Sequence, residues 1–167
     1  MARSFGLPLV ERDEAWAIAV ALDGADQVDP HLNLIKGGGG ALLKEKIVAA
    51  AARQLIIVVD YTKRVPVLGH PVPLPVEVVP FGWRNTARRI ESLGLKVHIR
   101  ESNGGPFVTE SGHYILNVRV DRIDDPAALE AQLHLIPGVV ETGLFVGRTD
   151  VLIVGTPKKV EVHRARL

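Results

Sequence analysis

Four charged side chains near the start of the chain have the types and spacing for acid–base chemistry. Asp23 and Asp26 flank a Gly-Ala turn, Lys36 precedes a run of glycines, and Glu45 follows that run. An Asp-Gly pair alone is better explained as a turn or a cap. Here two acids, a lysine and a glycine run are predicted to meet at one edge of a sheet, which favours a binding or catalytic site.

The segment Lys36-Gly37-Gly38-Gly39-Gly40 is the most unusual in the chain. Glycines adopt positive φ and let a ligand approach the backbone amides. A helix is predicted to follow, and its first N–H groups favour anions, including phosphates and developing oxyanions. A flexible linker is the alternative, which the apolar segments on both sides disfavour. The run matches neither a Walker loop nor the dinucleotide fingerprint.

Position alone leaves two further residues ambiguous. Glu45 lies about one turn into the predicted helix, where glutamate is commonly a surface residue that complements the helix dipole. Lys63 follows Asp60-Tyr-Thr, and a lysine there would either hold a phosphate as a point charge or be a solvated loop residue. The neighbouring glycines and strand-end acids are what support a catalytic role for Glu45.

The elements that must position these residues follow a β-α-β order. Apolar runs at 16–22 and 55–59 are typical of buried parallel strands, and each ends on an acid. Strong helix formers fill 41–52 between them. In open α/β sheets, ligands bind beyond the carboxyl ends of the strands, which is where Asp23 and Asp60 lie.

The second half of the chain has a different pattern. Prolines are frequent from 65 to 80, and strand, helix, strand, strand, helix and strand then follow at 74–79, 84–93, 96–101, 107–120, 125–135 and 139–146. That order is the signature of a ferredoxin-like unit, and Val151 to Val154 is predicted to return to the first sheet.

We therefore predict an α/β protein in which an open, Rossmann-like, mostly parallel sheet carries an inserted ferredoxin-like α+β lobe. The Rossmann-like lobe is expected to comprise 1–70 plus 147–167, and the inserted lobe 71–146.

Composition excludes several classes of function. The 167 residues carry a net charge of +1, and their only basic cluster, at 158–166, is expected to be a solvated terminus, so no nucleic-acid partner is predicted. There are no cysteines, and no histidine stands at metal-ligand spacing from another, so no metal is predicted. The longest apolar run near the start is too short to span a membrane. We expect a cytoplasmic protein.

Several motifs together resemble the A-type ribose-5-phosphate isomerase family. They are Asp23-Gly24-Ala25-Asp26, Lys36-Gly-Gly-Gly39, Lys44-Glu-Lys46, Asp60-x-x-Lys63, Leu74-Pro-Val-Glu-Val-Val-Pro80 and Ile136-Pro-Gly-Val-Val-Glu-Thr-Gly-Leu-Phe145. They occur in family order over nearly the whole chain.

The resemblance implies interconversion of D-ribose 5-phosphate and D-ribulose 5-phosphate through an enediolate, without metal or organic cofactor. It implies that Glu45 is the general base, that Asp23 and Asp26 orient sugar hydroxyls, and that Lys36 stabilises oxyanion charge. The implied substrate-binding residues are Asp23, Gly24, Ala25, Asp26, Lys36, Gly37, Gly38, Gly39 and Lys63. Family members are usually dimers or tetramers, so a homodimer or homotetramer is expected.

Two departures from the family pattern matter. Gln27 stands where the family usually has glutamate, and a modest effect is expected because this residue is not the base. No part of the sequence matches the family's N-terminal Gly-x-Gly-Ser-Thr loop, which holds the phosphate, so weaker phosphate binding and one bare flank of the sheet are expected. A non-catalytic sugar-phosphate-binding module and an inactive remnant of the same fold are the alternatives.

Overall fold

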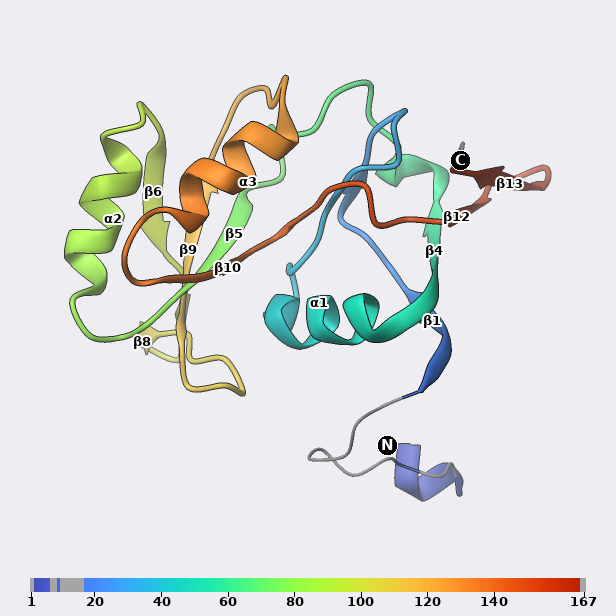
Figure 1. The fold of residues 1–167 in the computed structure, drawn as a ribbon, viewed down its shortest axis with the longest axis horizontal. Helices are drawn as coiled ribbons and strands as arrows, with labels where there is room; N and C mark the ends of the chain where they lie inside the picture. The colour runs from blue at the N-terminus through green and yellow to red at the C-terminus, as the bar shows by residue number, and fades with distance from the viewer. Residues whose placement is uncertain (1, 7–8, 10–16, 166–167) are drawn as a thin grey trace.

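A four-stranded sheet forms one half of the molecule (Figure 1). The computed structural model describes residues 2–6, 9 and 17–165. The strand order is β1-β4-β12-β13; the first three strands run parallel, and β13 is antiparallel to β12. Their bounds are β1 Ile18–Asp23, β4 Ala52–Asp60, β12 Val151–Gly155 and β13 Val160–Arg164. This confirms the predicted open, mostly parallel sheet.

A second, wholly antiparallel sheet forms the other half. Its order is β10-β5-β9-β6, with α2 (Trp83–Glu91) after β5 and α3 (Pro126–His134) after β9. The strands are β5 Leu74–Val78, β6 Lys96–Ile99, β9 Tyr114–Arg119 and β10 Val139–Thr142. Order and directions are those of a ferredoxin-like unit, which confirms the fold class. The limits 71 and 146 remain a prediction about how the chain divides.

Short elements connect the two halves. The strands β2 (Gln27–Val28), β3 (Leu34–Ile35) and β11 (Leu144–Phe145) form a small sheet in the order β11-β3-β2. Other short elements lie elsewhere. A 3₁₀ turn η2 (Tyr61–Lys63) follows β4, and η1 (Ala2–Phe5) lies near the start of the chain. In the inserted lobe, β7 (Glu101–Ser102) pairs with β8 (Gly105–Pro106). The sequence analysis did not predict β2 or β3, each of which is only two residues long.

The prediction of one strand from 139 to 146 was wrong, because Gly143 divides it. Residues before Gly143 pair with β5, and those after it pair with β3. The Gly143 N–H donates to Pro75 O (2.7 Å), and its carbonyl accepts from the Lys36 N–H (2.8 Å). A Cβ at this position would lie 2.3 Å from Lys36 O. The second sheet and the small sheet can therefore meet at Gly143 because this residue has no side chain.

The strand β13 was also missed, since the last residues were expected to be a solvated tail. It pairs with β12 along its whole length. Alternating Val160, Glu161, Val162 and His163 was the sequence signal for a strand exposed on one side. Arg166, part of the predicted basic cluster, and Trp16, the first residue of the first predicted strand, lie outside the described residues.

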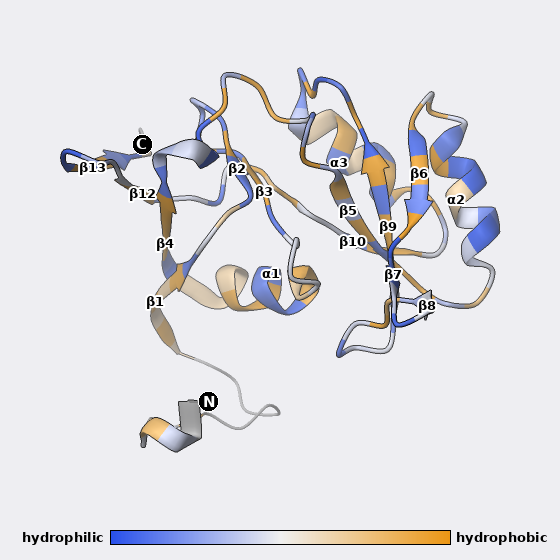
Figure 2. Cartoon of the chain, turned by 180° about the vertical axis from the view of Figure 1, so that it is seen from behind, coloured by the Kyte–Doolittle hydropathy of each residue, from blue (hydrophilic) through white to orange (hydrophobic). Residues whose placement is uncertain are grey.

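Each half has its own apolar core, and both cores consist mainly of Val, Ile and Leu side chains. One core packs α2 and α3 on the second sheet, with Ile90 and Leu133 at its centre. The other joins β1, β4 and β12 to the small sheet around Phe145. Figure 2 shows the apolar strands in both halves. No helix among the described residues is long and apolar enough to cross a membrane.

The helix α1 (Leu42–Ala51) is tied to the inserted lobe by a buried charge. Lys46 Nζ lies 2.8 Å from Glu130 Oε1 on α3 and 2.6 Å from Glu141 Oε1 on β10. His134 Nε2 lies 3.1 Å from the same Glu141 oxygen. Glu130, His134 and Glu141 are of metal-ligand type and close together, a grouping that histidine spacing alone did not reveal. The Lys46 ammonium already pairs with both carboxylates, so the cluster acts as a clamp between the halves.

Gln27 is buried against the backbone of Gly69. Its Nε2 donates to Gly69 O, and its Oε1 accepts from the Gly69 N–H, both at 2.8 Å. A neutral amide can make both bonds, whereas an ionised carboxylate can only accept. Gln27 therefore anchors the segment that leads into the inserted lobe, and it takes no part in the charged cluster described below.

Replacing Gly143 with alanine should destabilise the protein, because the new methyl group would overlap the Lys36 and Pro75 backbones. We expect a loss of about 2–3 kcal/mol in the free energy of unfolding, the usual range for overpacking, measured by urea denaturation. Gly105→Ala is the matched control, since a Cβ there meets nothing within 4 Å. Equal stability of the two variants would contradict the role given to Gly143.

Candidate active site

A buried ammonium is the centre of the candidate site. Lys36 is 3% exposed, and its Nζ donates to Gly24 O at 2.6 Å. The same nitrogen lies 2.9 Å from Asp23 Oδ2 and 3.1 Å from Glu45 Oε2. We call Asp23, Lys36 and Glu45 the Lys36 cluster. Burying a charge is costly unless it is paired, and two carboxylates and a carbonyl supply the pairing here.

Three elements bring the cluster together. Asp23 is the last residue of β1, Lys36 directly follows β3, and Glu45 lies in the first turn of α1. The Asp23 carboxylate is held by the Gly24 N–H at 2.8 Å. These positions follow from the β-α-β order, which brings a strand end and the next helix start to one edge of the sheet.

The Glu45 carboxylate has an oxygen that is paired in charge but accepts no hydrogen bond. Glu45 Oε2 is buried and lies beside the Lys36 ammonium, yet no donor in the described part of the chain is aimed at it. The side chain as a whole is 28% exposed. Such an oxygen lies beside a positive charge and keeps a lone pair free to accept a proton, which is what a general base requires.

Asp26 joins the site through the glycine loop, residues 37–40. Its Oδ2 accepts from the Gly38 N–H at 2.8 Å. Gly37 and Gly40 have φ of 98° and 88°, a region that side chains rarely adopt, so the loop requires glycine at these two positions. A Cβ on Gly38 would lie 2.9 Å from Asp26 Oδ1, whereas a Cβ on Gly39 meets nothing within 4 Å. The loop thus holds one acid and leaves Gly39 facing open space.

The inserted lobe supplies two contacts that sequence reasoning missed. Arg100 Nη1 donates to Gly37 O and to Gly38 O, both at 3.1 Å. The Phe107 ring packs where a Cβ on Gly40 would stand. Burial lowers the pKa of Arg100 from its ordinary value, while the charge of Asp26 opposes that change. No local motif marks Arg100, because its partners lie far away in the sequence.

The remaining predicted site residues have different positions. Gly24 contributes its carbonyl to Lys36, and Ala25 packs against the core below. Lys63 ends η2 at the carboxyl end of β4, and its charge acts on Asp60. Hydrogen bonds from Thr62 lower the pKa of Asp60 first, and Lys63 adds to that effect. No contact between Lys63 and the Lys36 cluster is found among residues 17–165.

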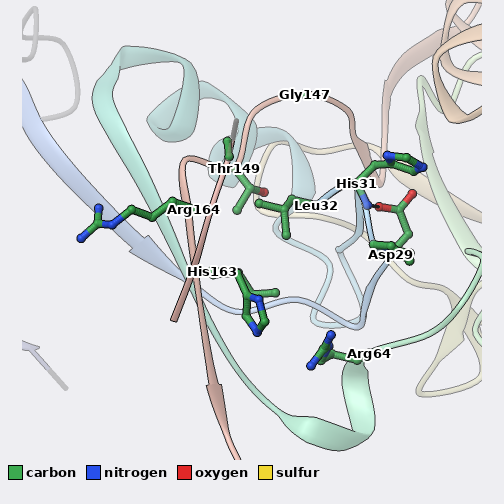
Figure 3. A pocket seen from close by; sticks show the side chains of 11 residues that line it. Asp29, His31, Leu32, Arg64, Gly147, Thr149, His163 and Arg164 are labelled. Atoms are coloured by element: carbon green, nitrogen blue, oxygen red, sulfur yellow. Dashed lines mark hydrogen bonds between the residues drawn. The ribbon is translucent and has the colours of Figure 1, made fainter. Parts of the chain in front are cut away.

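A separate hollow of about 760 Å³ lies against β12 and β13 (Figure 3). It shares no lining residue with the Lys36 cluster. Its basic side chains Arg64 and His163 face each other, and Glu161 Oε2 lies 3.2 Å and 3.5 Å from them. Lys159 most strongly, with His163 and Arg64, lowers the pKa of Glu161. The close grouping of carboxylates around an ammonium that proton transfer requires is found at the Lys36 cluster, and this hollow contains none of its residues.

An open α/β sheet with a carboxylate and a lysine at its carboxyl edge defines an α/β enzyme equipped for proton transfer beside an oxyanion. Comparison with known proteins narrows this class. The model of the family "Ribose 5-phosphate isomerase A (phosphoriboisomerase A)" matches residues 1–159. The chain belongs to this family of aldose–ketose isomerases.

Relatives and solved structures agree with that placement. Ribose-5-phosphate isomerase A of Thermococcus kodakarensis is 45% identical over 96% of this chain and 71% of its own length. That of Thermosynechococcus vestitus is 48% identical over 93% of this chain and 66% of its own. A D-ribose-5-phosphate isomerase solved with phospho-erythronic acid superposes with a TM-score of 0.93 at 40% identity, covering 98% of this chain and 72% of that one. The chain thus spans roughly two thirds to three quarters of the length of these proteins.

Gly38→Ala should perturb Asp26 selectively, because the added methyl group would press on its carboxylate. Asp26 is only half-buried and can swing away, so we expect little loss of stability. The hydrogen bond between Asp26 and the amide of residue 38 should be lost. Its loss should be visible as faster hydrogen exchange at the amide of residue 38 than in the unsubstituted chain. Gly105→Ala again serves as control, and unchanged exchange at Gly38 would show that the loop tolerates a side chain there.

Proposed function

We propose that this chain interconverts D-ribose 5-phosphate and D-ribulose 5-phosphate, with Glu45 as the general base. The observation that carries the proposal is the buried Glu45 Oε2, which is charge-paired with Lys36 yet accepts no hydrogen bond in the described structure. Membership of the isomerase family supports the substrate class. Glu45, Asp23, Asp26 and Lys36 are the proposed catalytic residues.

In the proposed reaction, the Glu45 carboxylate removes the proton from C2 of the open-chain aldose. The electron pair of that C–H bond forms the C1–C2 double bond, and O1 takes the carbonyl electrons, which gives an enediolate. Glu45 then returns the proton to C1, while the proton of the C2 hydroxyl moves to O1 and a carbonyl forms at C2. Atoms and charges balance, and no redox partner is needed.

Lys36 has the position to stabilise the oxygen that becomes negative. Its ammonium lies in a site with little water, where such an interaction is stronger than in bulk solvent. Asp23 and Asp26 stand on either side of the turn that provides the Gly24 carbonyl, and their carboxylates would accept hydrogen bonds from sugar hydroxyls. Gly37, Gly38 and Gly39 would line the site. The open space beside Gly39 would leave room for the substrate next to the loop backbone.

Lys63 is proposed to contact the phosphate. It lies at the carboxyl end of β4, the strand next to β1, and so on the same edge of the sheet as Asp23. An ammonium there binds a phosphate as a point charge. The phospho-erythronic acid bound by the solved relative is a phosphorylated acid whose planar carboxylate resembles an enediolate, so it should bind this chain more tightly than ribose 5-phosphate does.

We further propose that copies of this chain associate. The strand β1 is the edge of the first sheet in the described structure, and Leu22 on it is 71% exposed. Val20 on β1 and Val58 on β4 are also exposed. Unpaired edges with apolar side chains promote association of strands or sheets, in line with the predicted homodimer or homotetramer.

Glu45→Gln should slow isomerisation strongly while leaving the fold intact, because the amide keeps the shape of the side chain but cannot accept the proton. A coupled assay for ribulose 5-phosphate formation should show kcat reduced by about 10³-fold, within the range for loss of a general base. Glu91→Gln, an exposed substitution on α2, is the control and should retain full activity.

The turnover assay and a binding measurement together separate the alternatives. Binding of phospho-erythronic acid by calorimetry without turnover in the unsubstituted chain would identify a binding module, and neither binding nor turnover would identify an inactive remnant. Turnover that persists in Glu45→Gln would refute Glu45 as the base.

A further inference from the structure

We propose that Arg100, on the inserted lobe, is a positioning residue that fixes Asp26 through the glycine loop. Its guanidinium touches neither Asp26 nor the Lys36 cluster by any hydrogen bond found in the described chain. It acts on the backbone carbonyls of Gly37 and Gly38, and the Gly38 amide in turn holds the acid. The effect on turnover rests on the function proposed above, whereas the effect on Asp26 does not.

The guanidinium is fixed from both sides. Nη1 donates to Gly37 O and Gly38 O, and on the opposite side Nε and Nη2 donate to Asn117 Oδ1 at 3.3 Å and 2.8 Å. Asn117 lies on β9, in the middle of the second sheet. A rigid strand therefore orients a planar fork of donors, and the fork orients two successive peptide groups of the loop.

Peptide geometry turns this contact into a constraint on Asp26. In a trans peptide, the N–H points away from the C=O of the same plane. The plane whose carbonyl is Gly37 O therefore directs the Gly38 N–H away from Arg100, where it donates to Asp26 Oδ2. The contact to Gly38 O anchors the next peptide plane as well, so the Gly38 residue is held on both sides. The Gly38 amide is thereby kept aimed at the Asp26 carboxylate.

Charge and packing reinforce the arrangement. Arg100 stays protonated even though burial lowers its pKa, because arginine does not lose its charge in proteins. Its positive charge on one face of the loop and the negative charge of Asp26 on the other attract each other through the aligned peptide dipoles. The Phe107 ring lies 5.8 Å from the guanidinium and closes the loop at Gly40.

The glycine loop needs such an external anchor because glycines impose few limits on their own backbone. The Lys36 cluster does not depend on it, since the partners of Lys36 are Gly24, Asp23 and Glu45. Loss of the Arg100 fork should therefore release Asp26 while it leaves the base in place. Misplacement of a substrate-orienting group by about 1 Å can cost on the order of 10²-fold in rate.

A double-mutant cycle in the full chain tests the proposal through activity. Arg100→Lys keeps the charge but loses the planar fork, and kcat should fall by about 10–100-fold. Asp26→Asn should lower kcat by itself. Adding Arg100→Lys to it should lower kcat little further, because the carboxylate that Arg100 positions is already absent. Asn117→Ala, which frees the guanidinium, should act in the same direction. Arg89→Lys, exposed on α2, is the control.

A second measurement does not depend on activity. In the unsubstituted protein, the NMR shift of the Gly38 amide proton should follow the protonation of Asp26 as the pH is lowered. In Arg100→Lys that response should disappear, while thermal unfolding confirms an intact fold. Additive effects on kcat, or a Gly38 amide that still responds in the variant, would overturn the role of Arg100. If the unsubstituted chain turns over no substrate, the proposed function fails, and the NMR result still decides the inference.

Discussion

The pairing of one buried ammonium with three oxygens is the interaction on which the rest of the site depends. Lys36 satisfies the end of β1 through Asp23 and Gly24 and the start of α1 through Glu45. Without that charge, two carboxylates would face each other in a poorly solvated place, where like charges repel strongly. The strand and the helix can approach only because Lys36 lies between them, so the same ion pairs that assemble the site also place the Glu45 carboxylate beside an ammonium.

The inserted lobe is part of this arrangement. Its helix α3 and strand β10 hold α1 through Lys46, its strand β9 holds the glycine loop through Arg100, and Gly143 joins its backbone to that of Lys36. These contacts fall at the Lys36 backbone, in the glycine loop and at Lys46, which directly follows Glu45. A lobe attached at one point could swing freely, but one that contacts the helix, the loop and the lysine backbone fixes all three relative to the sheet.

How far the sequence predicted this structure depended on the range of each interaction. Apolar runs and helix formers are local signals, so β1, β4, α1 and the ferredoxin-like order were predicted correctly. Asp23, Asp26, Lys36 and Glu45 were predicted to surround one site, because strand ends and helix starts share one edge in a β-α-β unit. Ion pairs join Asp23, Lys36 and Glu45, whereas Asp26 contacts the glycine loop. The break at Gly143, the clamp at Lys46 and the contact of Arg100 involve partners distant in sequence. A single sequence contains no local pattern for them.

The unpaired oxygen of Glu45 shows why the site is built at the expense of stability. A buried acceptor without a hydrogen bond costs free energy, and a donor at that place would stabilise the fold. It would also bind the lone pair that proton abstraction requires. Lys36 supplies charge to this oxygen without a well-directed hydrogen bond, and the Gly38 N–H of the glycine loop is turned toward Asp26 instead. The Asp26 carboxylate is thus held by the Gly38 amide, whereas the Glu45 oxygen accepts no hydrogen bond in the described structure, and this difference matches the two roles proposed for them.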